Sequence, residues 1–175
     1  MKYKIMLLLF LLLSNNGFSN NFAIRQEFKE SNGICSCAPN QLDMNIKSFL
    51  IDNNIFSLQQ YIVWLNTNIT YKNDVNGDYW NHPEKTLKDR YGDCEDMAFL
   101  NEAVLRVLGY SGEVLGVYRW NSAHAIFVFK NNNIYSYFSN NIFINTKTTT
   151  TKAFKQYILI KYNCYKTRVL KLKEG

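Results

Sequence analysis

The chain has 175 residues, of which 47% are hydrophobic and 15% aromatic, which is enough apolar material for one domain with a core. Charged residues make up 19% and only two residues are proline, which excludes a disordered tail or a proline-rich linker. The net charge is +6, and the lysines and arginines form no long block, so the sequence gives little reason to expect nucleic-acid binding.

Residues 1–19 have the features of a secretory signal sequence. Two lysines stand near the start, residues 5–13 form an unbroken apolar run, and Gly17 and Ser19 place small side chains before a cleavage point. The run is shorter than the about 20 apolar residues that a bilayer span needs, and an uncleaved N-terminal anchor is the alternative. We therefore expect residues 20–175 to form a single exported domain, periplasmic or secreted, without stable membrane insertion after cleavage.

Helical spacing of apolar residues predicts helices over residues 42–51 and 58–69, followed by a polar connection over residues 70–85. A longer helix is predicted to begin after Asp93, which can cap it, and to end at Gly109. The buried stripe of this helix consists of Met97, Leu100, Val104 and Leu108.

After this helix the pattern changes to that of strands. Four strands are predicted, over residues 113–118, 123–130, 134–138 and 157–162, with a hairpin turn at residues 131–133 and a loop at residues 146–151. Helices followed by antiparallel strands, with no internal repeat, predict an α+β fold in a single domain.

The four cysteines are interpreted in the light of export, because oxidising compartments favour disulfides. If Cys94 is kept reduced for chemistry, either Cys35 or Cys37 could pair with Cys164 and join the two ends of the chain, and the sequence does not choose between them. No pair of cysteines has the spacing of a zinc finger, and the two histidines are not placed as further ligands, so no zinc site is expected.

Cys94 is the first candidate for chemistry, because it opens the longest predicted helix. Free backbone N–H groups and the helix dipole stabilise an anion at this position, so the thiol is expected to have a lowered pKa and to be a good nucleophile. The alternative is a small buried residue, which is the commoner role of a lone cysteine. A base within reach of the thiol would favour the first interpretation.

His124 is the candidate base. It lies on the predicted strand 123–130, and the small side chains of Ala123 and Ala125 would let the start of the helix approach closely. A cysteine at a helix start and a histidine on a strand are together the parts of a thiolate–imidazolium pair. The alternative is a histidine satisfied within the core. His82 precedes a proline in the polar connection and is expected at the surface.

Short segments between residues 64 and 140 stand in an arrangement typical of one known family. They are Asp78-Tyr79-Trp80, Pro83-Glu84-Lys85-Thr86-Leu87, Gly92-Asp93-Cys94-Glu95-Asp96, His124-Ala125-Ile126-Phe127-Val128 and Tyr137-Phe138-Ser139-Asn140. The arrangement resembles that of the bacterial transglutaminase-like cysteine peptidases. This resemblance implies a papain-like, transglutaminase-core fold, in which a cysteine-bearing helix packs on an antiparallel sheet that carries a histidine and then an aspartate.

The resemblance implies a role for each matching residue. Cys94 matches the nucleophile and His124 the general base, whereas the family's aspartate falls on Ser139, with Asn140 beside it. No carboxylate lies between His124 and Glu174, so a neutral side chain would have to orient the imidazole. The register favours Ser139 and the chemistry favours Asn140. Because neighbouring strand residues face opposite ways, only one of them can take this role.

The resemblance also implies that carboxylates near the cysteine bind calcium in some members, and the matching positions are Asp93, Glu95 and Asp96. Calcium favours clustered carboxylate oxygens, although helix capping is the alternative role for these residues. No organic cofactor is expected. Trp80 and Trp120 are expected to lie in the core or in a pocket wall.

The sequence as a whole predicts an exported cysteine peptidase that cleaves a protein substrate through a thiolate–imidazolium pair and an acyl-enzyme. Family members include enzymes that release large adhesins from the cell surface, so the resemblance implies such an adhesin as a substrate. Two alternatives stay open. The acyl group could pass to an amine, as in true transglutaminases, or the missing aspartate could mark a catalytically weakened binding module.

Overall fold

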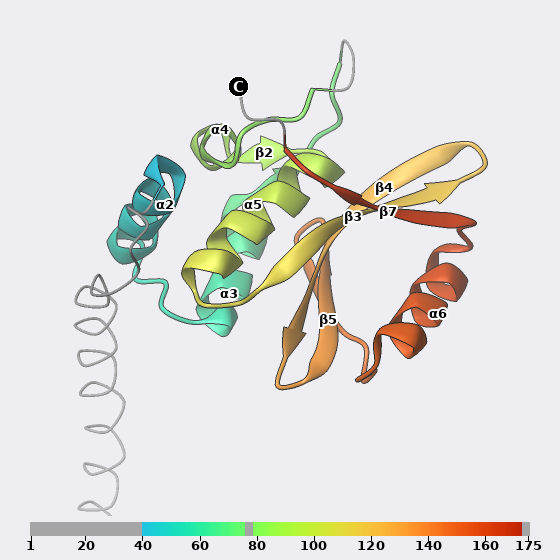
Figure 1. Ribbon diagram of the computed structural model, residues 1–175. Coiled ribbons are helices and arrows are strands. Elements are labelled where there is room, and N and C mark those ends of the chain that lie inside the picture. Colours follow the sequence, from blue (N-terminus) through green and yellow to red (C-terminus); the bar gives the residue numbers. More distant parts are fainter. Residues whose placement is uncertain (1–39, 76–78, 173–175) are drawn as a thin grey trace, which may run out of the picture. The chain divides into compact units, whose positions relative to one another are not determined.

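The computed structural model describes residues 40–75 and 79–172 (Figure 1). The expected signal sequence, Cys35 and Cys37 lie outside these residues, so the predictions about them are not tested. In chain order the elements are α2 (Gln41–Asp52), α3 (Leu58–Asn68), β1 (Thr70–Tyr71), α4 (Pro83–Asp89), β2 (Tyr91–Gly92), α5 (Cys94–Val107), β3 (Gly112–Arg119), β4 (Ser122–Asn131), β5 (Ile134–Ser139), β6 (Ile142–Asn145), α6 (Thr151–Tyr162) and β7 (Lys166–Leu170). None of the described helices combines the length and the apolar character that crossing a bilayer requires.

The first two helices begin where a capping residue stands. The side chain of Asn40 accepts a hydrogen bond from the backbone of Asp43 at the start of α2, and Ser57 does the same for Gln60 at the start of α3. Each cap satisfies one of the N–H groups that a helix leaves free at its N-terminus. The predicted helices over residues 42–51 and 58–69 are therefore confirmed to within a residue or two.

The central helix is α5, and it is buried along most of its length. It contacts α2 and α4 as well as strands β3, β4 and β5 of the sheet. The helix begins at Cys94 as predicted. It ends after Val107, where Gly109 has a φ of 90°, a backbone conformation that favours glycine at a helix C-terminus.

Five antiparallel strands form one sheet in the order β6-β5-β4-β3-β7. The turn between β4 and β5 consists of Asn132 and Asn133, whose φ values of 50° and 63° are those of a two-residue hairpin turn. The α+β fold, the predicted asparagine turn and the strands over residues 113–118, 123–130 and 134–138 are confirmed.

Helices cover the two faces of this sheet, α5 on one and α6 on the other (Figure 1). Side chains of a strand alternate between the faces, so successive residues of β4 enter different cores. Val117 and Ile126 lie in the core beneath α6, together with Tyr137, Phe154 and Ile158.

Residues 157–162, predicted as a strand, are instead the second half of helix α6. The run from Tyr157 to Ile160 contains the aromatic and β-branched residues that are enriched in strands, which explains the error. Phe154 and Ile158 are spaced four residues apart and both pack on the sheet, and Thr150 caps the helix by accepting a hydrogen bond from the Ala153 N–H. Burial of this stripe outweighs the local strand preference.

The predicted polar connection over residues 70–85 also contains a short helix that the pattern did not reveal. Helix α4 starts at Pro83, which suits the first helical position because proline lacks the N–H that would be free there. It ends at Arg90, whose φ is 64°. This short helix packs against both α2 and α5.

The docking of α6 can be tested by truncating its buried aromatic residue. Replacing Phe154 by alanine should lower the free energy of unfolding by about 3–5 kcal/mol, because it leaves a cavity between helix and sheet. Lys152→Ala is the control on the same helix and should change stability by less than about 0.5 kcal/mol. Denaturant unfolding measures both, and equal effects would contradict the packing of α6.

Candidate active site

Close packing of the backbone at Gly92 against the first turn of α5 fixes the position where this helix starts. Gly92 is buried, and a β-carbon added there would lie 2.7 Å from the β-carbon of Asp96 and 3.2 Å from Thr86. Only glycine fits this space. The parallel pairing of β1 with β2, which sets Tyr71 opposite Gly92, holds the chain just before the helix. Asp93 occupies the predicted N-cap position, but its side chain makes no capping hydrogen bond.

The thiol of Cys94 is partly buried between its own helix and strand β4. Its Sγ donates a hydrogen bond to the Glu95 carboxylate, with 3.0 Å between sulfur and Oε2. The backbone N–H of Ala125 interacts with the sulfur from the side of β4. Since Ala125 follows His124 in the strand, the fold brings the cysteine to the stretch of chain that carries the candidate base.

The environment of the thiol raises its pKa instead of lowering it. Burial is the largest cause, and the hydrogen bond to Glu95 adds to it, so that the pKa of Cys94 rises to about 12. The backbone N–H of Ala125 acts in the opposite direction. The predicted lowering of this pKa is therefore wrong for the free protein, because burial and an adjacent carboxylate act on the thiol besides the helix start.

His124 lies near the start of β4, and its ring contacts a neighbouring strand and α6. Its Nε2 is 2.8 Å from the hydroxyl oxygen of Ser139 on β5, and its ring centroid is 5.7 Å from that of Tyr162. Burial, and then the positive charge of Arg119, lower the pKa of the imidazole.

The free site therefore holds two neutral groups rather than an ion pair. Among the described residues the Cys94 thiol hydrogen-bonds to Glu95 and the His124 ring to Ser139, and the two are not hydrogen-bonded to each other. A raised thiol pKa and a lowered imidazole pKa both disfavour transfer of the proton at rest.

The structure distinguishes the two residues that were open as the third member of the site. Ser139 is the last residue of β5, pairs with Ile126 and faces the imidazole. Asn140 follows in the turn to β6 with a φ of 55°, and its backbone carbonyl accepts a hydrogen bond from the Asn101 side chain at 3.1 Å. Ser139, not Asn140, is thus the residue in contact with His124.

The three carboxylates proposed for calcium do not form a common cage. Both oxygens of Asp96 accept hydrogen bonds from Asn81, one from its backbone and one from its side chain, each at 2.7 Å. Glu95 accepts the thiol hydrogen bond, and burial raises the pKa of Asp93. Within residues 40–75 and 79–172 no group of three or more potential ligands converges on a metal position. Calcium binding by these residues stays an untested prediction.

Asp96 has a structural role that the sequence did not reveal. Its paired hydrogen bonds to Asn81 fix the segment that leads into α4 against the first turn of α5. A fully buried carboxylate is stable only when hydrogen-bond donors satisfy it, and Asn81 supplies two of them. The sequence gives little indication of this role for Asn81, because no neighbouring residue shows that its partner, Asp96, lies fifteen residues further along the chain.

The two tryptophans differ in their surroundings. Trp80 is 40% exposed and its ring lies 5.5 Å from that of Phe99, so it forms part of a wall over α5. Trp120 is 88% exposed, and its only aromatic contact among the described residues is with Tyr165, at 5.1 Å. The prediction that Trp120 lies in the core or in a pocket wall is wrong, because it stands at the tip of the β3–β4 hairpin.

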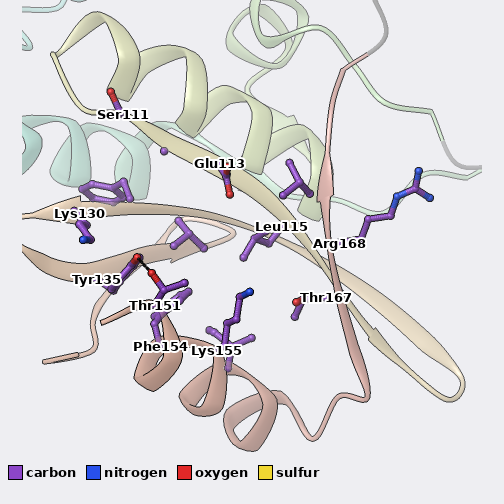
Figure 2. A pocket seen from close by; sticks show the side chains of 15 residues that line it. Ser111, Glu113, Leu115, Lys130, Tyr135, Thr151, Phe154, Lys155, Thr167 and Arg168 are labelled. Atoms are coloured by element: carbon purple, nitrogen blue, oxygen red, sulfur yellow. Dashed lines mark hydrogen bonds between the residues drawn. The ribbon is translucent and has the colours of Figure 1, made fainter. Parts of the chain in front are cut away.

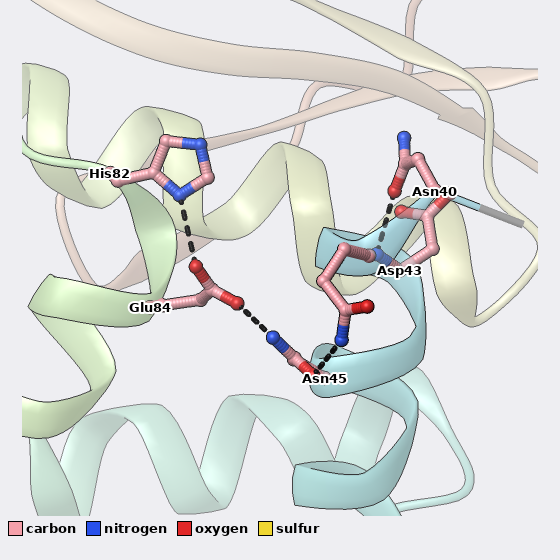
Figure 3. A network of polar contacts seen from close by, with 6 residues as sticks. Asn40, Asp43, Asn45, His82 and Glu84 are labelled. Carbon is pink, nitrogen blue, oxygen red and sulfur yellow. Dashed lines mark hydrogen bonds and ion pairs between the residues drawn. The ribbon is translucent and has the colours of Figure 1, made fainter. Parts of the chain in front are cut away.

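The second histidine lies at the surface, as predicted. His82 precedes α4, and its Nδ1 is 3.3 Å from a carboxylate oxygen of Glu84. Glu84 also accepts a hydrogen bond from Asn45 of α2, in the polar network shown in Figure 3. His82 thus helps to join α2 to α4, and it leaves His124 as the histidine of the candidate site.

Residues 51–137 match the sequence profile of the transglutaminase-like superfamily. The match spans the start of α5 with Cys94 and strand β4 with His124. This protein carries a domain of the transglutaminase-like superfamily, with a cysteine-bearing helix packed on an antiparallel sheet. The sequence matches no curated protein significantly.

Two solved structures illustrate how distant the individual relatives are. A proposed cysteine protease from Cytophaga hutchinsonii aligns with 18% identity and a TM-score of 0.47, covering 60% of this chain and 41% of that one. LapG of Legionella pneumophila aligns with 15% identity and a TM-score of 0.42, covering 71% of this chain and 76% of that one.

Removing the charge of Glu95 should activate the thiol. In Glu95→Gln the carboxylate that holds the thiol proton is gone, so the pKa of Cys94 falls and more thiolate is present at any given pH. The rate of iodoacetamide alkylation at pH 8 should rise about tenfold, which corresponds to one unit of pKa. Glu102→Gln, on the same helix, is the control and should leave the rate unchanged. An unaltered rate in Glu95→Gln would contradict the role given to this carboxylate.

Restoring the family's carboxylate should change the titration of the imidazole. Ser139→Asp places a negative charge beside Nε2, which favours the imidazolium, so the pKa of His124 should rise. Nuclear magnetic resonance titration of the ring measures this shift. Asn140→Asp is the matched control and should give a clearly smaller shift, whereas an equal or larger one would show that residue 140 faces the ring.

Proposed function

We propose that this protein is an exported cysteine peptidase, with Cys94 as the nucleophile and His124 as the proton carrier. The observation that carries the proposal is the 2.8 Å contact between His124 Nε2 and the Ser139 hydroxyl. His124 lies on β4, and the backbone N–H of the next residue of that strand, Ala125, interacts with the Cys94 sulfur. That contact orients the ring and leaves Nδ1 for the thiol, which is the arrangement that a thiol–imidazole pair needs.

The first step begins from neutral groups. The Cys94 side chain turns from Glu95 toward His124 as a peptide carbonyl enters the site. The sulfur then bonds to the carbonyl carbon while its proton passes to Nδ1, giving a tetrahedral oxyanion and an imidazolium. The backbone N–H of Cys94, free at the helix start, is placed to donate to that oxyanion.

The second half of the reaction uses the same proton. The imidazolium protonates the leaving amine, the carbon–nitrogen bond breaks, and an acyl-enzyme remains on Cys94. Water then attacks the acyl carbon while His124 accepts one of its protons, and the carboxylic acid leaves as the thiol is re-formed. Ser139 positions the ring throughout by a neutral hydrogen bond, in place of a carboxylate that would also stabilise the imidazolium.

The place of action and the substrate are part of the same proposal. The signal-like residues 1–19 support export to the periplasm or the exterior, where cell-surface proteins such as adhesins are available as substrates. No step of the proposed reaction uses calcium.

A second candidate function is supported by the raised pKa of the Cys94 thiol. A thiol held neutral by burial and Glu95 is a poor nucleophile at neutral pH, and serine in place of aspartate stabilises an imidazolium less. A binding module that has kept the transglutaminase-like fold would have these features. Transfer of the acyl group to an amine instead of water is the remaining alternative.

Replacing Cys94 by alanine should abolish the hydrolysis of fluorescently labelled casein, because the acyl-enzyme can no longer form. Cys164→Ala is the matched control, since its sulfur is also partly buried and forms no disulfide within the described residues but lies after α6, and it should leave the rate unchanged. Fragments with the parent protein and the control, and none with Cys94→Ala, would support the peptidase. Incorporation of a labelled amine into casein without fragments would indicate acyl transfer, and neither reaction would favour the binding module.

A further inference from the structure

The charges of the sequence from residue 40 to residue 172 are divided between two halves. Residues 114–172 contain nine lysines and arginines and no aspartate or glutamate, whereas residues 40–113 contain eleven acidic and six basic residues. All nine basic side chains are exposed. They are Arg119, Lys130, Lys147, Lys152, Lys155, Lys161, Lys166, Arg168 and Lys171. The basic residues are scattered along the sequence and form no contiguous block. This part of the domain nevertheless carries only positive side-chain charges.

A cavity of about 530 Å³, lined mostly by residues of this basic half, lies between α6 and the sheet (Figure 2). We call it the α6 groove. The groove is lined by residues of β3, β4, β7 and α6, and its interior is apolar. The apolar lining includes Leu115, Val128, Phe154 and Ile158. Such an interior suits a hydrocarbon side chain better than a hydrated ion.

Charged side chains stand around the apolar interior of the groove. Lys155 extends from α6 toward the sheet, and Glu113 points toward the groove from β3 (Figure 2). Lys130 completes the basic lining and also lies over the ring of Tyr135, 4.9 Å from its centroid, whereas the side chain of Arg168 points away from the groove (Figure 2). No ion pair joins Lys155 to Glu113 in the part of the chain that the structure describes. The basic groups are therefore available to an acidic ligand.

The side of the groove formed by β7 is the edge of the sheet. Within residues 40–75 and 79–172 strand β7 pairs with β3 alone, so along its other edge no described strand pairs with its backbone N–H and carbonyl groups. Thr167 and Val169 pair with Val117 and Leu115, residues that face α6, and so they line the groove beside that edge. An extended peptide could lie along β7 and direct one side chain into the apolar interior.

We propose that the α6 groove binds an extended acidic segment of the protein substrate, with one apolar side chain of that segment inside the groove. Charge complementarity selects the occupant, because Glu113 is the only carboxylate among the described residues that line the groove. The identification of the partner as a substrate rests on the proposed peptidase function. The binding itself does not, since it needs neither Cys94 nor His124.

The groove would act at a distance from the scissile bond. Val128 lies four residues after His124 on β4, which corresponds to about 13 Å along a strand. A segment held in the groove would thus be several residues away from the bond that is cleaved. Recognition would depend on acidic sequence beside the cleavage site rather than on the residues at the cleaved bond.

Binding can be measured in the Cys94→Ala protein, where no turnover interferes. The probe is a short fluorescein-labelled peptide with a central leucine flanked by glutamates, and fluorescence anisotropy reports its affinity. Lys155→Glu should weaken binding about tenfold, because it places a like charge beside the peptide. Lys152→Glu is the control on the same helix and outside the groove, and it should weaken binding by less than about threefold. Glu113→Gln should tighten binding.

Three results would overturn the proposal. The first is equal binding of a peptide in which glutamine replaces every glutamate. The second is equal weakening by Lys155→Glu and Lys152→Glu, which would indicate general attraction to the basic half. The third is binding of phosphatidylglycerol vesicles without binding of the peptide, which would make the groove a lipid-binding surface. Peptide binding by a protein that cleaves nothing would overturn only the peptidase function.

Discussion

The close packing of the first turn of α5 against the chain before it and against β4 is the constraint on which the candidate site depends. Gly92 leaves no room for a side chain, and the small Ala125 offers its backbone N–H to the Cys94 sulfur. A larger residue at either position would move the thiol away from the strand that carries His124. Paired hydrogen bonds from Asn81 to the buried Asp96 hold the same turn from its other side.

The same packing determines the chemical state of the site. Burial brings the thiol to the imidazole-bearing strand, but it also favours the neutral forms of both groups, and Glu95 holds the thiol proton. These surroundings favour a neutral thiol over a standing thiolate, so in the proposed reaction the proton transfer would accompany the attack. In the proposed reaction, Glu95 would hold the thiol proton until a substrate displaces this hydrogen bond.

Elements whose local signals agree with their tertiary surroundings could be predicted from the sequence. The helix that opens at Cys94 and ends before Gly109, and the asparagine turn between β4 and β5, are examples in which the capping or turn residue itself dictates the backbone. The prediction failed at residues 157–162, where β-branched residues suggested a strand. There the spacing of Phe154 and Ile158 against the sheet decided for a helix.

The sequence by itself determined the α+β order of elements, the helix-start cysteine, the strand histidine and the superfamily resemblance, because each depends on residues close together in the chain. Only the tertiary structure decided that Ser139 rather than Asn140 meets the imidazole, since that choice depends on the register between β4 and β5. It also decided that the pKa of the Cys94 thiol is raised rather than lowered. Basic residues that are far apart in the sequence lie around one groove only in the folded chain. Burial and charge proximity are properties of the folded chain, because they arise from groups that are distant in sequence.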